Sequence, residues 1–131
     1  MMENRFVSLR DMSIALPLLQ DIVDESSLKI ISSIIDVEKN VFQICFENKL
    51  PLSSTYKKIR KLQSDGLVSV EKIDIDSRGK KVVFYKSNIK SLDFNLKKEG
   101  IILQFDRNDR DYFKSSANKN SNYKQSTLVG L

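Results

Sequence analysis

The chain contains no histidine and a single cysteine, Cys45. Without histidine, the commonest general base is missing, and so are the Ser–His and Cys–His pairs that activate nucleophiles. A zinc site would have to rely on carboxylates, and one cysteine cannot form an internal disulfide. Cys45 lies in the apolar run VFQICF, where we expect a buried structural thiol. We therefore predict that the protein is not an enzyme and has neither a cofactor nor a metal.

Glycine and long apolar runs are also scarce. The four glycines are too scattered along the chain to form a phosphate-binding loop. No apolar run approaches the length of a membrane span, and the first residues, MMENRFVSLRD, lack the basic start and apolar stretch of a signal peptide. We therefore expect a cytoplasmic protein with no membrane partner. A chain of 131 residues that is 40% hydrophobic is long enough for one domain with a core.

Basic charge is abundant, and it is concentrated in one segment. Residues 49–90 hold 11 of the 22 Lys and Arg but 4 of the 17 Asp and Glu, which gives this segment a net charge of +7. The rest of the chain sums to −2, and no acidic residue occurs between Lys49 and Ser64. Such a concentration of positive charge is typical of a surface that binds nucleic acid.

Apolar spacing predicts three helices before residue 50. The first covers 17–24, with Pro17 in its first turn. The second is capped by Ser26 or Ser27, and the third covers 39–48. The predicted apolar face of the second helix is Leu28, Ile31, Ile34 and Ile35, and that of the third is Val41, Phe42, Cys45 and Phe46.

A fourth helix and a hairpin are predicted within the basic segment. The helix runs from Ser53, its N-cap, to Ser64, and its apolar stripe is Tyr56, Ile59 and Leu62. Asp65–Gly66 should end it, because glycine readily adopts the left-handed conformation of a helix C-terminus. Two strand-like runs, LVSVEKIDI and KKVVFYK, then flank a turn at 76–79. The alternation of the first run changes face midway, which indicates a twist or a β-bulge.

A second hairpin is predicted further along the chain. Leu92, Phe94 and Leu96 alternate with polar residues, a turn follows at 97–100, and Ile101, Leu103 and Phe105 then alternate again. Because a two-stranded hairpin is marginal alone, its apolar face should pack on the domain or on another subunit. From residue 108 the chain is polar and repetitive, and we expect it to be mostly disordered.

The order helix, helix, turn, helix, hairpin covers residues 26–88, about half of the chain. Its most specific string is P-L-S-S-T-Y-x-x-I-x-x-L-x-x-x-G-L-V, from Pro51 to Val68. This string joins a helix start rich in serine and threonine to an apolar stripe and to the Gly-Leu-Val that enters the hairpin. In these residues the chain resembles the archaeal and bacterial winged helix-turn-helix transcription regulators of the ArsR/MarR-like type.

The resemblance implies an α+β fold with a three-helix core and a β-hairpin wing, and the hairpin predicted at 92–105 is an additional C-terminal β-hairpin in this chain. It also implies a recognition helix at Ser53–Ser64 in the major groove of double-stranded DNA and a wing tip at Ser77–Lys81 on flanking phosphates. Hydroxyls and amides at a helix start suit phosphate oxygens, and lysines on its outer face can reach bases or backbone. The expected DNA-binding residues are Ser53, Ser54, Thr55, Lys57, Lys58, Arg60, Lys61, Arg78, Lys80 and Lys81.

The resemblance further implies a sequence-specific regulator of transcription that associates with the nucleoid. Many relatives are homodimers, and we expect a homodimer here, formed through residues 14–24, through residues 92–105 or through both. The predicted organisation has four parts: an N-terminal segment with a short helix and a dimerisation role at 1–25, the DNA-binding winged helix-turn-helix domain at 26–90, the hairpin extension at 91–107, and the disordered tail at 108–131.

Two other functions fit the same residues. A winged helix can act as a protein-interaction module in a transcription or replication assembly, in which case the basic surface is incidental. A non-specific nucleoid protein would share the basic helix and wing, and the excess of lysine over arginine in the helix leaves this alternative open, since arginine is the better bidentate reader of guanine. Binding through phosphates should weaken steeply with salt, whereas apolar docking should not.

Overall fold

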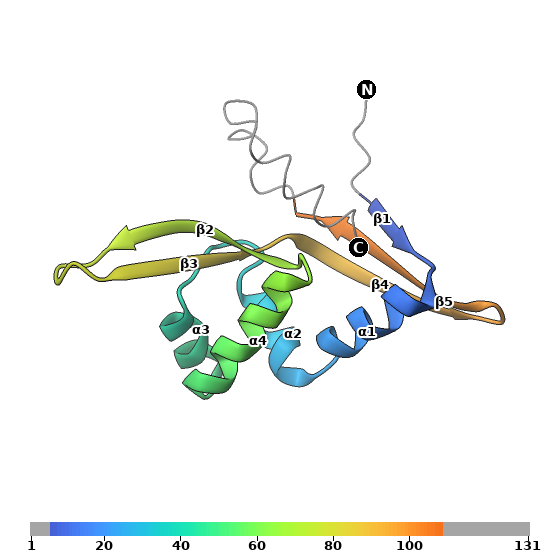
Figure 1. The fold of residues 1–131 in the computed structure, drawn as a ribbon, viewed down its shortest axis with the longest axis horizontal. Helices are drawn as coiled ribbons and strands as arrows, with labels where there is room; N and C mark the ends of the chain where they lie inside the picture. Colours follow the sequence, from blue (N-terminus) through green and yellow to red (C-terminus); the bar gives the residue numbers. More distant parts are fainter. Residues whose placement is uncertain (1–5, 109–131) are drawn as a thin grey trace, which may run out of the picture.

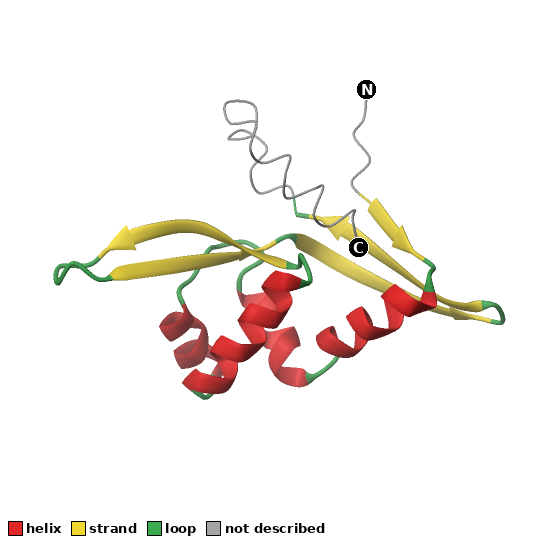
Figure 2. Ribbon diagram, in the orientation of Figure 1, coloured by secondary structure: helices red, strands yellow, loops and turns green. Residues whose placement is uncertain are grey.

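The computed structural model describes residues 6–108, which form four helices and five strands in two antiparallel sheets (Figures 1 and 2). The fold class is therefore α+β, as predicted. The helices are α1 (Met12–Ile22), α2 (Glu25–Ser33), α3 (Val41–Asn48) and α4 (Leu52–Ser64). The strands are β1 (Phe6–Leu9), β2 (Val68–Ile75), β3 (Lys81–Ser87), β4 (Ile89–Lys97) and β5 (Gly100–Arg107). Within this described part, no helix has the length and apolar character needed to cross a membrane.

Helix α1 begins five residues earlier than predicted. Asp11 is its N-cap, and the Asp11 carboxylate accepts a hydrogen bond from the backbone N–H of Ser13 at 3.0 Å. Pro17 lies inside the helix and not in its first turn, so one backbone hydrogen bond is missing there. Burial of Ala15, Leu18 and Ile22 on one face of α1 offsets this loss.

The N-cap of α2 is Asp24, and the prediction of Ser26 or Ser27 was wrong. The Asp24 carboxylate accepts a hydrogen bond from the backbone N–H of Ser27 at 2.8 Å, which satisfies one of the free amides of the first turn. The buried face of α2 matches the prediction in part. Ile31 and Ile34 are buried as predicted, but Leu28 is 48% exposed, and Ile30 is buried in its place.

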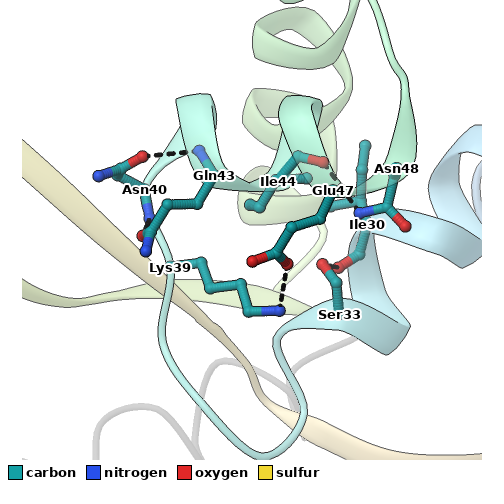
Figure 3. A network of polar contacts seen from close by, with 8 residues as sticks. All are labelled: Ile30, Ser33, Lys39, Asn40, Gln43, Ile44, Glu47 and Asn48. Atoms are coloured by element: carbon teal, nitrogen blue, oxygen red, sulfur yellow. Dashed lines mark hydrogen bonds and ion pairs between the residues drawn. The ribbon is translucent and has the colours of Figure 1, made fainter.

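A network of polar contacts fixes the start of α3 (Figure 3). The Asn40 side chain accepts from the backbone N–H of Gln43, and the Gln43 side chain accepts from the backbone N–H of Asn40, both at 2.9 Å. This reciprocal capping box sets where the helix begins. The ammonium of Lys39, just before it, pairs with Glu47 of the helix at 2.6 Å.

The prediction that Phe42 and Phe46 face inward was wrong. Helix α3 buries Val41 and Ile44, while Phe42 is 63% exposed and Phe46 is 86% exposed. The run VFQICF places apolar residues around most of the helix circumference, so its spacing does not by itself select the buried face.

Helix α4 begins at Leu52, with Pro51 at the N-cap position and no side-chain cap, so Ser53 is not the cap as predicted. Ile59 and Leu62 are buried as expected, but the third buried residue is Thr55, and Tyr56 is 37% exposed. The buried stripe therefore differs from the prediction at its first position, where Thr55 takes the place of Tyr56.

The C-terminus of α4 matches the prediction. Gly66 has a left-handed φ of 85°, and its N–H donates to the Gln63 carbonyl at 3.0 Å. The N–H of Leu67 donates to the Leu62 carbonyl at 2.9 Å, which completes a Schellman motif, and both leucines are buried. This motif turns the chain directly from α4 into β2.

Strands β2 and β3 form the predicted hairpin, and its register shifts between Val70 and Lys72. The shift confirms that the apolar face of β2 changes midway. The base of the hairpin is tied to the loop between α2 and α3, because Lys39 and Tyr85 exchange two backbone hydrogen bonds of 3.1 and 2.8 Å. These bonds fix the direction of the hairpin relative to the helices.

The second hairpin is part of a three-stranded sheet of order β1–β5–β4. The pairs Leu92–Phe105, Phe94–Leu103 and Leu96–Ile101 lie opposite one another, which confirms that these six side chains share a face. Strand β1, which was not predicted, pairs with β5. Leu103 and Phe105 join one hydrophobic cluster with buried residues of all four helices, including Ala15, Ile30, Ile44 and Ile59.

A buried polar junction joins the two sheets. Asn88, between β3 and β4, donates to the Gly66 carbonyl at 3.0 Å and accepts from the Ser69 hydroxyl at 2.8 Å. Asn108 donates to the Ile35 carbonyl at 2.7 Å. Apart from Asn108, the predicted disordered tail lies outside the described residues.

Candidate nucleic-acid interface

Four of the ten residues predicted to bind DNA lie together on the exposed surface of α4: Ser53, Ser54, Lys57 and Arg60. We call these four residues the basic face. Within residues 6–108, neither Lys57 nor Arg60 belongs to an ion pair. The basic face therefore presents two uncompensated positive charges and two hydroxyl groups to solvent.

Thr55 does not belong to this face, and the expectation that it contacts a groove was wrong. Its side chain is 2% exposed, and its hydroxyl donates to the Pro51 carbonyl at 2.7 Å. A short polar side chain can occupy the buried stripe at this point because the unpaired carbonyls at the helix start accept its hydrogen bond.

Two of the predicted lysines are partly compensated by acidic residues. The Lys58 ammonium pairs with Asp24 at 2.9 Å, and Lys61 lies 3.7 Å from Asp21. Burial raises the pKa of Asp24, but hydrogen bonds from the Ser27 backbone and from Lys58 outweigh burial and hold the pKa below its ordinary value. Lys58 therefore links α4 to the N-terminus of α2, and the uncompensated positive surface is narrower than the sequence predicts.

The opposite flank of α4 faces the β2–β3 hairpin through tyrosines. Burial raises the pKa of the Tyr85 hydroxyl, nearby Tyr56 raises it further, and the Arg60 guanidinium lowers it. Arg60 therefore lies close enough to β3 to act on Tyr85, at the boundary between the helix and the hairpin. This position agrees with the expectation that Arg60 lies near the flank of the face.

The other three predicted residues lie at the tip of the β2–β3 hairpin: Arg78 and Lys80 in the turn, and Lys81 at the start of β3. All three are exposed. The Asp76 carboxylate accepts hydrogen bonds from the backbone N–H groups of Arg78 and Lys80 at 2.8 and 2.9 Å. Gly79, with a φ of 81°, provides the left-handed residue of the turn. The acidic residue of the turn thus orders its backbone and leaves the cationic side chains in solvent.

The basic face and the hairpin turn are separate in space. Figure 1 shows the hairpin extending past α3 and α4, with its turn at one end of the long axis of the molecule. Eight residues of β2 span roughly 26 Å at about 3.3 Å per residue. The structure therefore provides two positive surfaces at different distances along the molecule.

The net charge of residues 49–90 does not show which of its lysines are free to contact an anionic ligand. Lys86 is 8% exposed and donates to the Asp36 carbonyl, and Lys72 lies near Glu38 and Asp74, so neither adds free charge to the surface. Lys49, which the site prediction omitted, is exposed in the turn before α4. Its position next to the Leu50–Pro51 break was the signal that could have identified it.

Neither a protein-family model nor a curated protein matches this chain in sequence. The functional proposal below is therefore built on the surface chemistry of α4 and of the β2–β3 hairpin.

Proposed function

We propose that residues 25–87 form a winged helix-turn-helix that binds double-stranded DNA and regulates transcription. In this proposal α4 is the recognition helix and the β2–β3 hairpin is the wing. The order of α2, α3, α4 and the hairpin supports it, as does the short turn at 49–51 between the last two helices. The Lys39–Tyr85 bridge and the Schellman motif further support it, because they hold the wing in a fixed direction beside α4.

The observation that carries the proposal is the basic face, where no acidic side chain interrupts α4. A helix is about 10–12 Å across with its side chains, which matches the roughly 12 Å width of the major groove. Lys57 and Arg60 would reach base edges or phosphates from the exposed side of the helix. The hydroxyls of Ser53 and Ser54, with the free amides of the first turn, would donate hydrogen bonds to a phosphate at the positive end of the helix.

The wing turn would contact the DNA beyond the groove that α4 occupies. Arg78, Lys80 and Lys81 are long cationic side chains on an ordered backbone turn, a combination that suits phosphate contact or entry into a narrow minor groove. Each lysine or arginine that neutralises a phosphate releases counterions, so binding becomes strongly salt-dependent.

Fluorescence anisotropy with duplex DNA, titrated between about 50 and 200 mM salt, tests this function. We expect the logarithm of the association constant to fall steeply and linearly with the logarithm of the salt concentration. A set of unrelated duplexes then distinguishes a regulator from a general nucleoid protein, since specific sites bind at least about 1,000-fold more tightly than random sequence. Absence of binding at the lowest salt concentration would rule the function out.

One observation favours the second candidate, a protein-interaction module. Phe42 and Phe46 lie one helical turn apart on α3, and both are largely exposed. Contiguous exposed apolar side chains often mark a surface that a protein partner covers. If this candidate is right, the protein fails to bind DNA at low salt, and a double Phe42→Ser/Phe46→Ser variant folds normally but loses a salt-insensitive interaction. If the DNA proposal is right, the same variant keeps its DNA affinity.

A further inference from the structure

The flank of α4 that faces α1 and the start of α2 is lined by acidic side chains from outside the helix. Asp21, near the end of α1, lies 3.7 Å from the ammonium of Lys61. Asp24, the N-cap of α2, lies 2.9 Å from the ammonium of Lys58. Lys61 is one helical turn from Lys57 of the basic face. The acidic side chains therefore lower the positive potential along this side of the proposed recognition helix.

This flank also holds a second carboxyl group next to Asp21. Asp65, the C-cap residue of α4, lies beside the Asp21 carboxyl, and its Oδ2 is buried without a hydrogen-bond donor within residues 6–108. Two ionised carboxylates offer each other only acceptors, whereas a shared proton turns one of them into a donor. The hydrogen bonding of this carboxyl pair is therefore complete only when it holds one proton.

The surroundings of Asp65 favour that proton. Burial is the largest cause, the Asp21 carboxyl adds to it, and Lys61 opposes both, with the net result that the pKa of Asp65 rises from 3.8 to about 6. Asp21 is the one charged residue of α1. Other charged residues lie on the elements that pack against α4 but do not act on Asp65: Glu25 and Lys29 of α2, Glu47 of α3, and Glu71, Lys72 and Asp74 of β2.

The composition of the chain leaves few other groups that can change charge near pH 6. The chain contains no histidine, the side chain that ordinarily titrates between about pH 5 and 8. Unperturbed carboxyl groups titrate near about pH 4 and lysines above about pH 10. Asp21, Asp65 and Lys61 together carry a net charge of −1 when both carboxyls are ionised, and they are neutral when the pair holds one proton.

We propose that the Asp21–Asp65 pair regulates DNA binding by α4, because uptake of one proton removes a negative charge beside Lys61 and strengthens the attraction of this flank for phosphates. The inference rests on the proposed DNA-binding function and adds a regulation to it. By linkage, bound DNA must raise the proton affinity of the pair by the same factor by which the proton raises the affinity for DNA. Binding is therefore tighter under mildly acidic conditions.

Fluorescence anisotropy of the full chain with one duplex, at about pH 5.5 and pH 7.5 and at equal ionic strength, tests the regulation. We expect wild type to bind about threefold more tightly at the lower pH, the size expected for one charge roughly 10 Å from the phosphates. Asp65→Asn is neutral at both pH values, so its affinity should be the same at both and should match that of wild type at the lower pH. Asp93→Asn, which removes an exposed carboxylate of β4, is the control and should respond to pH as wild type does.

The possible results separate this inference from DNA binding itself. Wild-type binding of equal strength at the two pH values overturns the regulation and leaves the proposed function standing, and so does a folded Asp65→Asn variant that keeps the wild-type pH response. If Asp65→Asn does not fold, Asp21→Asn replaces it, because its amide donates to Asp65 at every pH and should also abolish the response. Absence of DNA binding at both pH values overturns the function and the regulation together.

A carbon-13 NMR titration of the carboxyl groups gives a readout without DNA. We expect a carboxyl resonance of wild type that titrates near pH 6 and is missing from the Asp65→Asn spectrum. If every carboxyl of the wild-type protein titrates below about pH 5, as unperturbed groups do, the pair holds no proton in the relevant range and the regulation is excluded.

Discussion

At the scale of single residues, the contact between Asp65 and Asp21 depends on a proton. Asp65 ends α4, and its buried Oδ2 has no hydrogen-bond donor within the described part of the chain. Burial first, and then the neighbouring Asp21 carboxyl, raise the pKa of Asp65; Lys61 opposes both, and the net result is a rise from 3.8 to about 6. Two carboxylates satisfy each other only when they share a proton, so the contact between α1 and α4 is strongest under mildly acidic conditions.

We expect Asp65→Asn to stabilise the protein at pH 7.5 by about 1 kcal/mol, a value that allows for screening of a half-buried group by solvent. The native pKa lies above the unfolded value, so the native state binds more protons between pH 3.8 and about 6. The wild-type contribution is complete below pH 3.8 and is lost as pH rises through about 6. Asparagine supplies a permanent donor to Asp21 and removes this dependence.

Urea unfolding at pH 5 and pH 7.5 measures the effect, and Asp93→Asn, which changes an exposed carboxylate of β4, is the control. The explanation fails if Asp65→Asn and the control respond to pH in the same way as wild type.

Thr55 and Ser54 are neighbours with opposite predicted roles. Thr55→Val removes a buried hydroxyl bonded to Pro51 and should lower the free energy of unfolding by about 1 kcal/mol, with DNA affinity unchanged. Ser54→Ala removes an exposed hydroxyl of the basic face and should weaken DNA binding with little change in stability. Thermal unfolding and anisotropy on both variants check the pair. Weaker DNA binding by a folded Thr55→Val protein would contradict the assignment of Thr55 to the core.

At the scale of elements, the join between α4 and β2 fixes the direction in which the wing leaves the helix. Gly66 adopts a left-handed φ of 85°, and its carbonyl also accepts from Asn88 at the junction of the two sheets. We expect Gly66→Ala to lower the free energy of unfolding by about 1–2 kcal/mol, because alanine is strained in this conformation. Gln63→Ala, at an exposed position of the same helix, should be nearly neutral, and equal effects of the two changes in urea unfolding would exclude this role.

The sequence predicted the elements whose signals are local. Gly66 marked the end of α4, the turn at 76–79 marked the first hairpin, and the alternation on either side of residues 97–100 marked the second hairpin and its turn. These signals depend on neighbours a few residues apart, and the physical preferences of glycine and of a pleated strand are sufficient to read them.

The sequence did not predict elements that depend on distant partners. Strand β1 exists because it pairs with β5, which lies nearly the whole chain away, and its four residues carry little pattern of their own. The uncompensated surface of α4 could not be predicted either, because Asp21 and Asp24 reach Lys61 and Lys58 only through helix packing. The same limit applies to α3, where spacing alone did not select the buried face.

At the scale of the whole molecule, the two hairpins extend in opposite directions. The turn of the β2–β3 hairpin is at one end of the long axis, and the β4–β5 turn beside α1 is toward the other (Figure 1). The buried junction around Asn88 ties the base of the β2–β3 hairpin to the start of β4, so the basic hairpin keeps a fixed direction relative to the second sheet.

The central claim is that the position of the positive charge determines DNA binding, and that net charge alone does not. Anisotropy with duplex DNA on two charge-matched variants, Lys57→Ala/Arg60→Ala on α4 and Lys97→Ala/Lys98→Ala at the β4–β5 turn, tests it most directly. Both variants lose two positive charges. We predict that the α4 variant loses at least about tenfold in affinity and that its salt slope falls by about 2, while the turn variant stays close to wild type. Equal losses in the two variants would contradict the account, as would a wild-type protein that binds no DNA.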